Sequence, residues 1–276
     1  MRFLYTSAAV IKTRSWPTMT FLGPKTKAVA QLSLLLSLAL IHVATVWASS
    51  FQVSPIQVFL SAKSSSALLS LRNQSNESLR FQLTVYGWDQ GPQGEDLFRS
   101  TDDIVFFPAL VTLAPGEERK IRIGAPAART AVEKSYRIFV EELPAQRRED
   151  AREQGQVRLL TKLGVPIFLQ PEKVAAEGRI EEMAVRKGVL SFQLKNTGNV
   201  HVVPQQIMVK GYGSTGEALF ERQLASWYLL AGGLRVYKLE LPKEHCVKTK
   251  ALSVDVQQGQ KSLQGRIDVR PESCKQ

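Results

Sequence analysis

The chain has 276 residues, with 36 basic and 25 acidic side chains and a net charge of +11. Five of the basic residues and none of the acidic ones fall within residues 1–48, so the remainder carries only +6, with both signs interspersed. A mild excess of this kind suits an anionic partner or simple solubility. Without a basic-aromatic motif, it argues against nucleic acid as a partner.

Residues 1–48 have the pattern of a secretory signal peptide. A basic stretch leads into an apolar core at residues 28–43, and Val46-Trp47-Ala48 supplies small residues where a signal peptidase cleaves. A membrane anchor is the weaker alternative, because the purely apolar stretch is shorter than the ~20 residues that a span needs. We therefore expect export with cleavage and no stable membrane insertion. Met19 is the alternative translation start, since it gives a leader of ordinary length.

Strand patterns dominate the rest of the chain, and no segment predicts an amphipathic helix. Residues 51–60 alternate imperfectly around Pro55, and a proline in such a run indicates an edge strand or a switch between sheets. Further apolar alternation predicts strands, with a loop at 89–96 and a Pro-Gly turn at 114–117. These strands cover residues 69–73, 81–88, 104–113 (a pair around Pro108), 120–124 and 136–143.

The longest strand signal runs from Val157 to Leu169, after a charged loop at 144–156. Both of its faces are partly apolar, which is usual for a strand in the centre of a sheet. At 13 residues it also exceeds the usual length of ~5–6. The polar segment 170–173 contains a proline and predicts a linker, which separates a domain at 49–170 from one at 171–276.

The order of motifs in the first half of the chain recurs in the second half. A repeat of roughly 120 residues has the size of a complete all-β domain and is too long for a solenoid unit. We therefore predict an all-β fold of two immunoglobulin-like β-sandwiches in tandem, with a binding rather than a catalytic function. The repeated motifs are LSLRN (69–73) and LSFQLKN (190–196), VYGW (85–88) and VKGY (209–212), GEDLF (94–98) and GEALF (216–220), and LAPG (113–116) and LAGG (230–233).

Cys246 and Cys274 are the two cysteines of the chain, and both lie late in the second half. In an oxidising compartment, two thiols in one domain usually pair. A disulfide here would stabilise the second domain by roughly 3–4 kcal/mol in the chain-entropy model. Two separate buried thiols are the alternative. A metal site is disfavoured, because the nearby His245 adds one ligand and zinc requires four.

The sequence holds no recognisable catalytic or cofactor-binding motif. It has no HExxH, CxxC or GxSxG motif and no phosphate loop. His201 and His245 lie far apart, and neither has the neighbours of a catalytic set. We interpret His201 as a surface or half-buried histidine. We expect no enzymatic activity, no cofactor and no metal.

Several segments, taken in order, resemble the periplasmic pilus-assembly chaperones of the PapD-like family. The resemblance covers the first domain strongly and the second loosely. The stretch Gly87-Trp88-Asp89-Gln90 resembles the branch that serves archaic, Csu-type (spore-coat-U-like) pili. The matching segments are FQVSPI (51–56), LRN (71–73), FFP through LAPG to IRI (106–123), YR through ELP (136–144) and VPIFLQP (165–171).

The resemblance implies a boomerang of two immunoglobulin-like domains that caps incomplete pilin subunits and passes them to an outer-membrane usher. A pilin lacks its last strand, and the chaperone lends its own edge strand to the open groove. We predict Val157, Leu159, Thr161 and Leu163 as the donor residues, a period-2 set in the long strand. The alternative is that this set faces the chaperone's own core, which would move the role to Leu160 and its neighbours.

The family also anchors the terminal carboxylate of the pilin with basic residues between the domains. Arg137 and Lys162 are the candidates here, each on a predicted strand of the first domain. A basic side chain among apolar neighbours is costly unless it is paired, and an incoming carboxylate would pair it. The alternative is a solvated charge, or one paired within the chain to Glu141 or Glu142.

The alternative function is an exported structural or adhesive surface protein made of two sandwiches. A pilin of that kind would show an N-terminal donor segment and an incomplete set of strands. Neither feature is visible in the sequence, so the chaperone interpretation is preferred.

Overall fold

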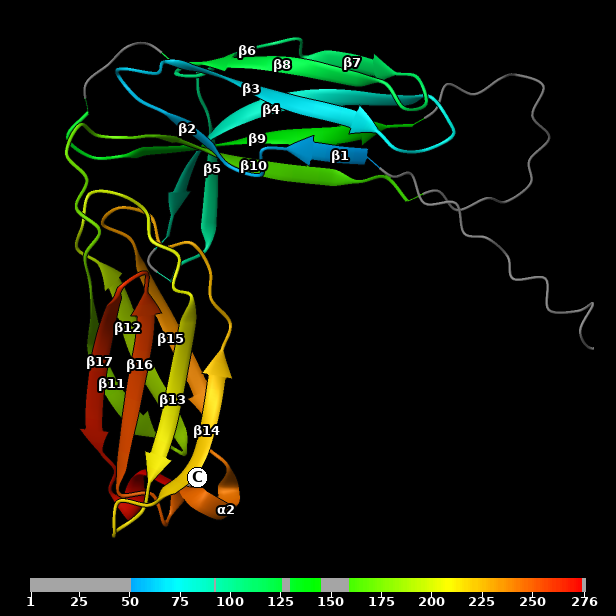
Figure 1. Cartoon of the computed structure of the whole chain (residues 1–276). Coiled ribbons are helices and arrows are strands. Elements are labelled where there is room, and N and C mark those ends of the chain that lie inside the picture. Colours follow the sequence, from blue (N-terminus) through cyan, green and yellow to red (C-terminus); the bar gives the residue numbers. More distant parts are fainter. Residues whose placement is uncertain (1–50, 92, 126–129, 145–158, 275–276) are drawn as a thin grey trace, which may run out of the picture. The chain divides into compact units, whose positions relative to one another are not determined.

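The computed structural model describes residues 51–91, 93–125, 130–144 and 159–274. Within these ranges the chain is almost entirely β-strand and forms two β-sandwiches, which belong to one compact unit spanning Ala48–Gln276 (Figure 1). The predicted all-β fold is confirmed. Residues 1–48, predicted to be a signal peptide, lie outside the described residues.

The first sandwich contains the strands β1 to β10. They are β1 (Phe51–Ser54), β2 (Val58–Leu60), β3 (Ser66–Asn73), β4 (Leu79–Gln90), β5 (Asp96–Ser100), β6 (Val105–Phe107), β7 (Leu110–Leu113), β8 (Glu118–Gly124), β9 (Lys134–Leu143) and β10 (Lys162–Leu169). One sheet has the order β1-β3-β8-β6. The other has the order β2-β10-β9-β4-β5, and β7 also pairs with β4.

The second sandwich contains the strands β11 to β17. They are β11 (Gly178–Arg186), β12 (Val189–Asn196), β13 (Gln206–Tyr212), β14 (Ala218–Leu224), β15 (Leu234–Glu240), β16 (Ala251–Gln258) and β17 (Lys261–Asp268). The sheets have the orders β11-β12-β15 and β14-β13-β16-β17. Two short helical segments, α2 (Lys243–Cys246) and η1 (Pro271–Cys274), were not predicted from the sequence.

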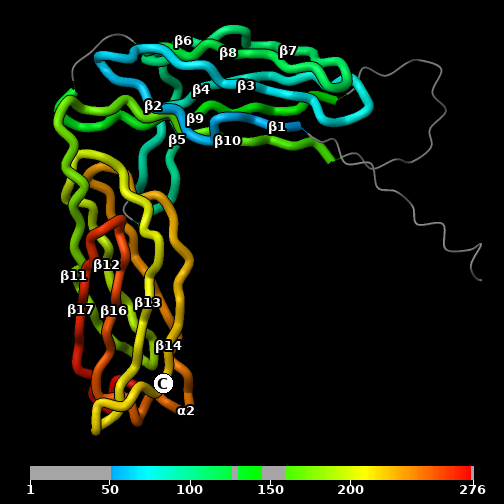
Figure 2. The backbone as a smooth tube through the Cα atoms, in the orientation of Figure 1, coloured from blue at the N-terminus to red at the C-terminus, as the bar shows by residue number. Residues whose placement is uncertain are grey.

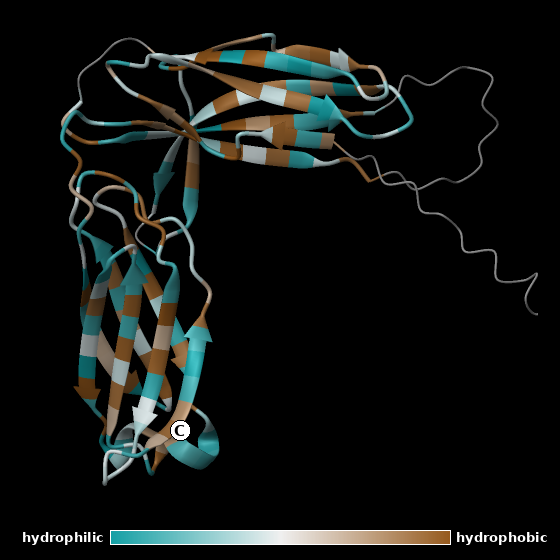
Figure 3. Cartoon of the chain, viewed as in Figure 1, coloured by the Kyte–Doolittle hydropathy of each residue, from teal (hydrophilic) through white to brown (hydrophobic). Residues whose placement is uncertain are grey.

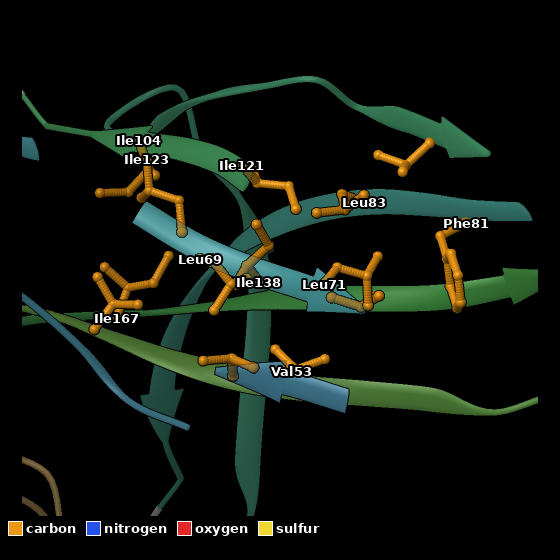
Figure 4. Close-up of a cluster of buried hydrophobic side chains, with 14 of the residues drawn as sticks. Val53, Leu69, Leu71, Phe81, Leu83, Ile104, Ile121, Ile123, Ile138 and Ile167 are labelled. Atoms are coloured by element: carbon orange, nitrogen blue, oxygen red, sulfur yellow. The ribbon is translucent and has the colours of Figure 1, made fainter. Parts of the chain in front are cut away.

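Each sandwich has its own apolar core, built by alternation along the strands. In β9, for example, Tyr136, Ile138 and Val140 are buried, as the period-2 pattern predicts. The side chains of both sheets of the first sandwich meet between the layers (Figure 4). The same alternation of apolar and polar residues appears as brown and teal bands along the strands (Figure 3). Each fully buried Leu or Ile stabilises the fold by about 1.5–3 kcal/mol. The alternating apolar residues of each sandwich therefore stabilise a core of their own.

At two of the points where the chain of the first sandwich passes from one sheet to the other, a proline separates the two short strands. β1 and β2 lie in different sheets with Pro55 between them, and β6 and β7 lie in different sheets with Pro108 between them (Figure 2). Both prolines follow a cis peptide bond. Because proline cannot donate to a strand ladder, these positions suit a break between two edge segments. The predicted switch at Pro55 and strand pair around Pro108 are confirmed.

The repeat in the sequence corresponds to a repeat in the pairing of strands. β3 pairs with β8 as β12 pairs with β15, and β4 pairs with β5 as β13 pairs with β14. In each sandwich the LSxxN-type motif ends the first strand of this set. The LAPG or LAGG motif precedes the last strand.

Two predicted boundaries were wrong. The loop expected at 89–96 is shorter, because β4 continues to Gln90, where it still pairs with Asp96 of β5. The predicted strand 157–169 begins at Lys162 in the structure, and its first two residues lie outside the described ranges. Within the part of the chain that is described, no helix has the length and hydrophobicity of a membrane span.

Candidate functional site

Strand β10 has two neighbouring strands along only part of its length. It pairs with β9 throughout, from Lys162 opposite Glu141 to Leu169 opposite Lys134. The short strand β2 runs parallel to β10 and covers only Ile167–Leu169. Within the described ranges, Lys162–Pro166 therefore pairs on one side only, and we call this stretch the open edge.

From Val165 onward, β10 is buried on both faces. Val165, Ile167 and Leu169 belong to the core of the first sandwich. Phe168 points to the opposite face and packs with Trp88 and with Leu230 of the second sandwich. This double burial explains why the sequence is apolar on both faces here, as in a central strand.

The predicted donor residues lie at and before the open edge, where they are exposed. Leu159 is 74% exposed and Leu163 is 41% exposed, and Thr161 is also exposed. Val157 lies outside the described residues. By alternation, the side chain of Leu163 is on the same face of the sheet as that of Val165, but it lies past the last residue of the core. The alternative residue Leu160 is also exposed, so apolar side chains are available on both faces of this segment.

Arg137 is paired inside the first sandwich, so the alternative of internal pairing is realised, but with a partner that was not predicted. Its Nη1 lies 3.2 Å from Oδ2 of Asp96, and its side chain is 11% exposed. The guanidinium sits 3.8 Å over the ring of Trp88 and 5.4 Å from that of Phe98. Burial lowers the pKa of Arg137, and Asp96 opposes that shift. Asp96 comes from β5, which β4 separates from β9, and the sequence pattern could not predict this order of strands.

Lys162 is exposed and lies at the start of the open edge. Its Nζ is 2.8 Å from Oε2 of Glu141 and 5.2 Å from the centre of the Phe139 ring. The hydrogen bond that Lys162 donates to Glu141 raises the pKa of Lys162. An exposed pair of this kind contributes at most about 1 kcal/mol. Another carboxylate can therefore replace Glu141 at little cost.

The structure places the two candidate cations on one face of the sheet but does not bring them together. Arg137 is opposite Pro166, four register positions from Lys162, or about 13 Å along the strand. Gly164 lies between them. A Cβ there would fall 2.8 Å from Cδ of Arg137 and 3.0 Å from Cε1 of Phe139. The glycine thus lets both side chains of β9 lie across β10.

A family model matches this part of the chain. Residues 50–175 match the PapD N-terminal domain, which is described as a pili and flagellar-assembly chaperone domain. The first sandwich is therefore similar to the PapD N-terminal domain family. The match includes every strand of this PapD-type sandwich and the open edge.

Several solved structures share the two-sandwich fold at low sequence identity. They include a chain of the CsuC–CsuE chaperone–tip adhesion subunit pre-assembly complex from archaic Csu pili of Acinetobacter baumannii, 16% identical with a TM-score of 0.55, covering 80% of this chain and 99% of that chain. A chain of the Salmonella enterica SafA pilin–SafB chaperone complex is 12% identical (TM-score 0.54, 79% and 97%). The Escherichia coli chaperone DraB is 14% identical (TM-score 0.52, 81% and 98%). No curated protein is a significant sequence match.

The β4–β5 hairpin of the PapD-type sandwich contacts the second sandwich through backbone groups. Gln90 donates from Nε2 to the Tyr228 carbonyl at 2.8 Å and accepts from the Leu230 N–H at 2.9 Å. Arg235 donates to the Gly94 carbonyl at 3.2 Å. These contacts hold the hairpin that carries Asp96, the partner of Arg137. Sequence reasoning noted Gln90 only as part of a motif and did not predict this contact.

A second contact between the sandwiches lies beside β10. The His201 N–H and Nδ1 are 2.8 Å and 2.7 Å from Oε1 of Glu133, whose side chain is fully buried. The imidazole stacks on Phe168 at 3.6 Å between ring centres. His201 is partly buried, which agrees with the second of the two states that the sequence predicted, a surface or a half-buried histidine. This contact fixes the covered end of β10 and leaves the open edge free of it.

The two cysteines are joined at the far end of the second sandwich. Cys246 in α2 and Cys274 in η1 form a disulfide with their Cα atoms 5.8 Å apart. In the described residues, no group of three or more His, Cys, Asp and Glu side chains is arranged to hold a metal ion.

Proposed function

We propose that this protein is an exported chaperone that caps incomplete pilin subunits by strand addition and delivers them to an outer-membrane usher. The open edge of β10 carries this proposal. Exposed leucines beside an unpaired strand edge invite aggregation unless a partner covers them. In strand addition, backbone hydrogen bonds supply affinity and alternate side chains supply fit.

Leu159 and Leu163 are the donor side chains in this proposal, with Val157 and Thr161 in the same period-2 row. A subunit that lacks a strand exposes a groove to its own core, and leucines from β10 would fill it. Burying one leucine contributes about 1.5–3 kcal/mol, so two would supply much of the binding energy.

Lys162 and Arg137 would hold the terminal carboxylate of the subunit. Their side chains lie on the face of the sheet opposite to that of Leu163. Lys162 is the accessible one, because Glu141 is a solvent-exposed partner that can be replaced. Arg137 would take part only if Asp96 released it, since the guanidinium is enclosed by Trp88, Phe98 and Asp96. A charge-assisted hydrogen bond to a carboxylate is stronger than a neutral one, which suits an anchor.

The comparisons support the partner class and the location. The PapD N-terminal family is described by its role in the assembly of pili and flagella. Two of the similar structures are complexes with a subunit, the CsuE tip subunit and the SafA pilin. Together with the GWDQ motif, the first of these supports an archaic, Csu-type branch. We place the mature protein in the periplasm, after cleavage of the leader.

Co-expression with a cognate pilin subunit tests the proposal. The unmodified chain should yield a soluble one-to-one complex, and Leu159→Asp and Leu163→Asp should each abolish it while the chaperone stays folded. Leu68→Asp is the matched control, because Leu68 lies on the other sheet and its exposure of 52% falls between those of Leu163 and Leu159. Capture that survives both edge substitutions would contradict the donor assignment.

A further inference from the structure

The direction of each backbone group in β10 follows from one hydrogen bond and the strand register. The Glu142 N–H donates to the Thr161 carbonyl at 2.9 Å, so the backbone of Thr161 faces β9. In an antiparallel ladder, residues that face the neighbour alternate with residues that face away. With Leu163 opposite Val140 and Val165 opposite Ile138, these two residues also face β9.

The even-numbered residues of β10 therefore face away from β9. Lys162, Gly164 and Pro166 direct their backbone groups to the open edge. The far end of the strand provides an independent check: the Gln170 N–H donates to the Leu60 carbonyl at 2.8 Å, which places another even-numbered residue toward β2. Both ends of the strand give the same assignment.

Pro166 is the last residue of the open edge, and it has no N–H. A proline at an odd-numbered position would remove a hydrogen bond to β9. At position 166 it removes none, which explains a proline within an otherwise regular strand. Immediately beyond it, β2 covers Ile167–Leu169. The edge thus ends in a residue without a donor, followed by a strand that is already in place.

We infer that Pro166 and β2 form a register stop for the added strand, so that a bound subunit pairs no further than Pro166. Within β10 the subunit then meets two N–H donors and two carbonyls, those of Lys162 and Gly164. The parallel register of Ile167 with Val58 directs the Pro166 carbonyl to the Val58 N–H of β2, so Pro166 offers the subunit neither a donor nor a free acceptor. This inference rests on the proposed function, since the added strand is the subunit's. The edge is about 17 Å long, or five residues.

A stop of this kind fixes which subunit side chains face the core. A slip by one residue turns every side chain of a strand to the opposite face. A slip by two residues keeps the faces but loses one of the two N–H donors, which weakens binding by roughly fivefold. The stop also keeps the added strand away from Phe168, which packs against the second sandwich.

Residue-resolved amide hydrogen exchange tests the inference on the free protein first. We expect the amides of Lys162 and Gly164 to exchange at least tenfold faster than those of Leu163 and Val165, which are bonded to β9. The opposite order would overturn the assignment, whether or not a subunit is captured. The expected order without subunit capture would support the edge assignment and contradict the proposed function.

The complex with a co-expressed subunit gives the second measurement. Lys162 and Gly164 should gain at least tenfold protection, while Leu163 and Val165 change little. Pro166→Ala should fold normally and slow subunit release by a few-fold, because it adds an N–H at the end of the edge. A complex in which Lys162 and Gly164 stay unprotected would overturn the inference. So would faster release from the Pro166→Ala variant in a normally folded chain.

Discussion

Each sandwich has a buried asparagine at the equivalent position, but the two sandwiches differ in the large hydrophobic side chains that their strands expose. Asn73 and Asn196 end equivalent strands, β3 and β12, and both are fully buried. Each donates from Nδ2 to three backbone carbonyls, one in the following loop and two beside the LAPG or LAGG turn. For Asn73 these are Glu77 (2.7 Å), Leu113 (3.1 Å) and Ala114 (3.1 Å), and for Asn196 they are Val200 (2.7 Å), Leu229 (3.0 Å) and Leu230 (3.0 Å).

This shared contact explains why the sequence repeats in the same order. The asparagine is a second donor to carbonyls at the LA turn, which also accept from a backbone N–H or a serine hydroxyl, and it ties the turn to the end of the strand. The strand-ending Asn and the LA turn therefore occur together in both halves. The sequence repeat therefore reflects the same contact between asparagine and turn in both sandwiches.

The exposed apolar side chains show where the sandwiches differ. In the described ranges, the strands of the second sandwich expose no large hydrophobic residue. Those of the first sandwich expose several, among them Leu163 at the open edge and Phe107 beside Pro108. The second sandwich instead carries the disulfide. This difference supports the proposal that the first sandwich binds the subunit.

The largest expected effect comes from removing the shared asparagine. Asn73→Ala and Asn196→Ala each remove a buried side chain that donates to three carbonyls and accepts from a backbone N–H two residues on. At about 1 kcal/mol for each net hydrogen bond, the loss should be on the order of 4 kcal/mol of unfolding free energy. Urea unfolding measures it, and Asn76→Ala, an exposed neighbour, should change little. A large loss for one asparagine alone would show that the two contacts are not equivalent.

Loss of the disulfide should affect the second sandwich alone. Replacing both Cys246 and Cys274 by Ser frees a loop of 28 residues and should cost roughly 3–4 kcal/mol. Unfolding with and without reductant measures this in the unmodified chain. Subunit capture should persist under reducing conditions at a temperature where the second sandwich is still folded. Loss of capture there would give the second sandwich a direct part in binding.

The smallest expected effect is an acid-dependent one in the first sandwich. Asp103 accepts hydrogen bonds from the Tyr136 hydroxyl at 2.7 Å and from Lys134 at 3.3 Å, which hold its pKa below the ordinary value. A lowered pKa gives stability that is present above the unfolded value, near 3.9, and is lost as the pH falls through the folded value.

Asp103→Asn should therefore reduce stability at pH 7 by less than about 1 kcal/mol, because the pair with Lys134 is half-exposed. The difference from the unmodified chain should vanish near pH 2. Urea midpoints at both pH values measure it, with Asp102→Asn as the matched variant. An equal loss at both pH values would assign the effect to packing instead.

The candidate site was predictable from sequence only in part. The long apolar segment pointed to β10, because a strand that is apolar on both faces is an unusual local signal. The partner of Arg137 was not predictable, since Asp96 is 41 residues away and reaches it through the pairing of β5 with β4 and β4 with β9. Glu133 and His201 gave no local signal either, because each is paired across the two sandwiches.

The sequence by itself determined the strands, their buried faces and the twofold repeat, because alternation and turn chemistry act over a few neighbouring residues. Only the tertiary structure decided which part of β10 is left unpaired. That depends on β2, more than 100 residues earlier in the chain, covering three residues and no more. Edges arise from pairing between distant segments, which no local pattern encodes.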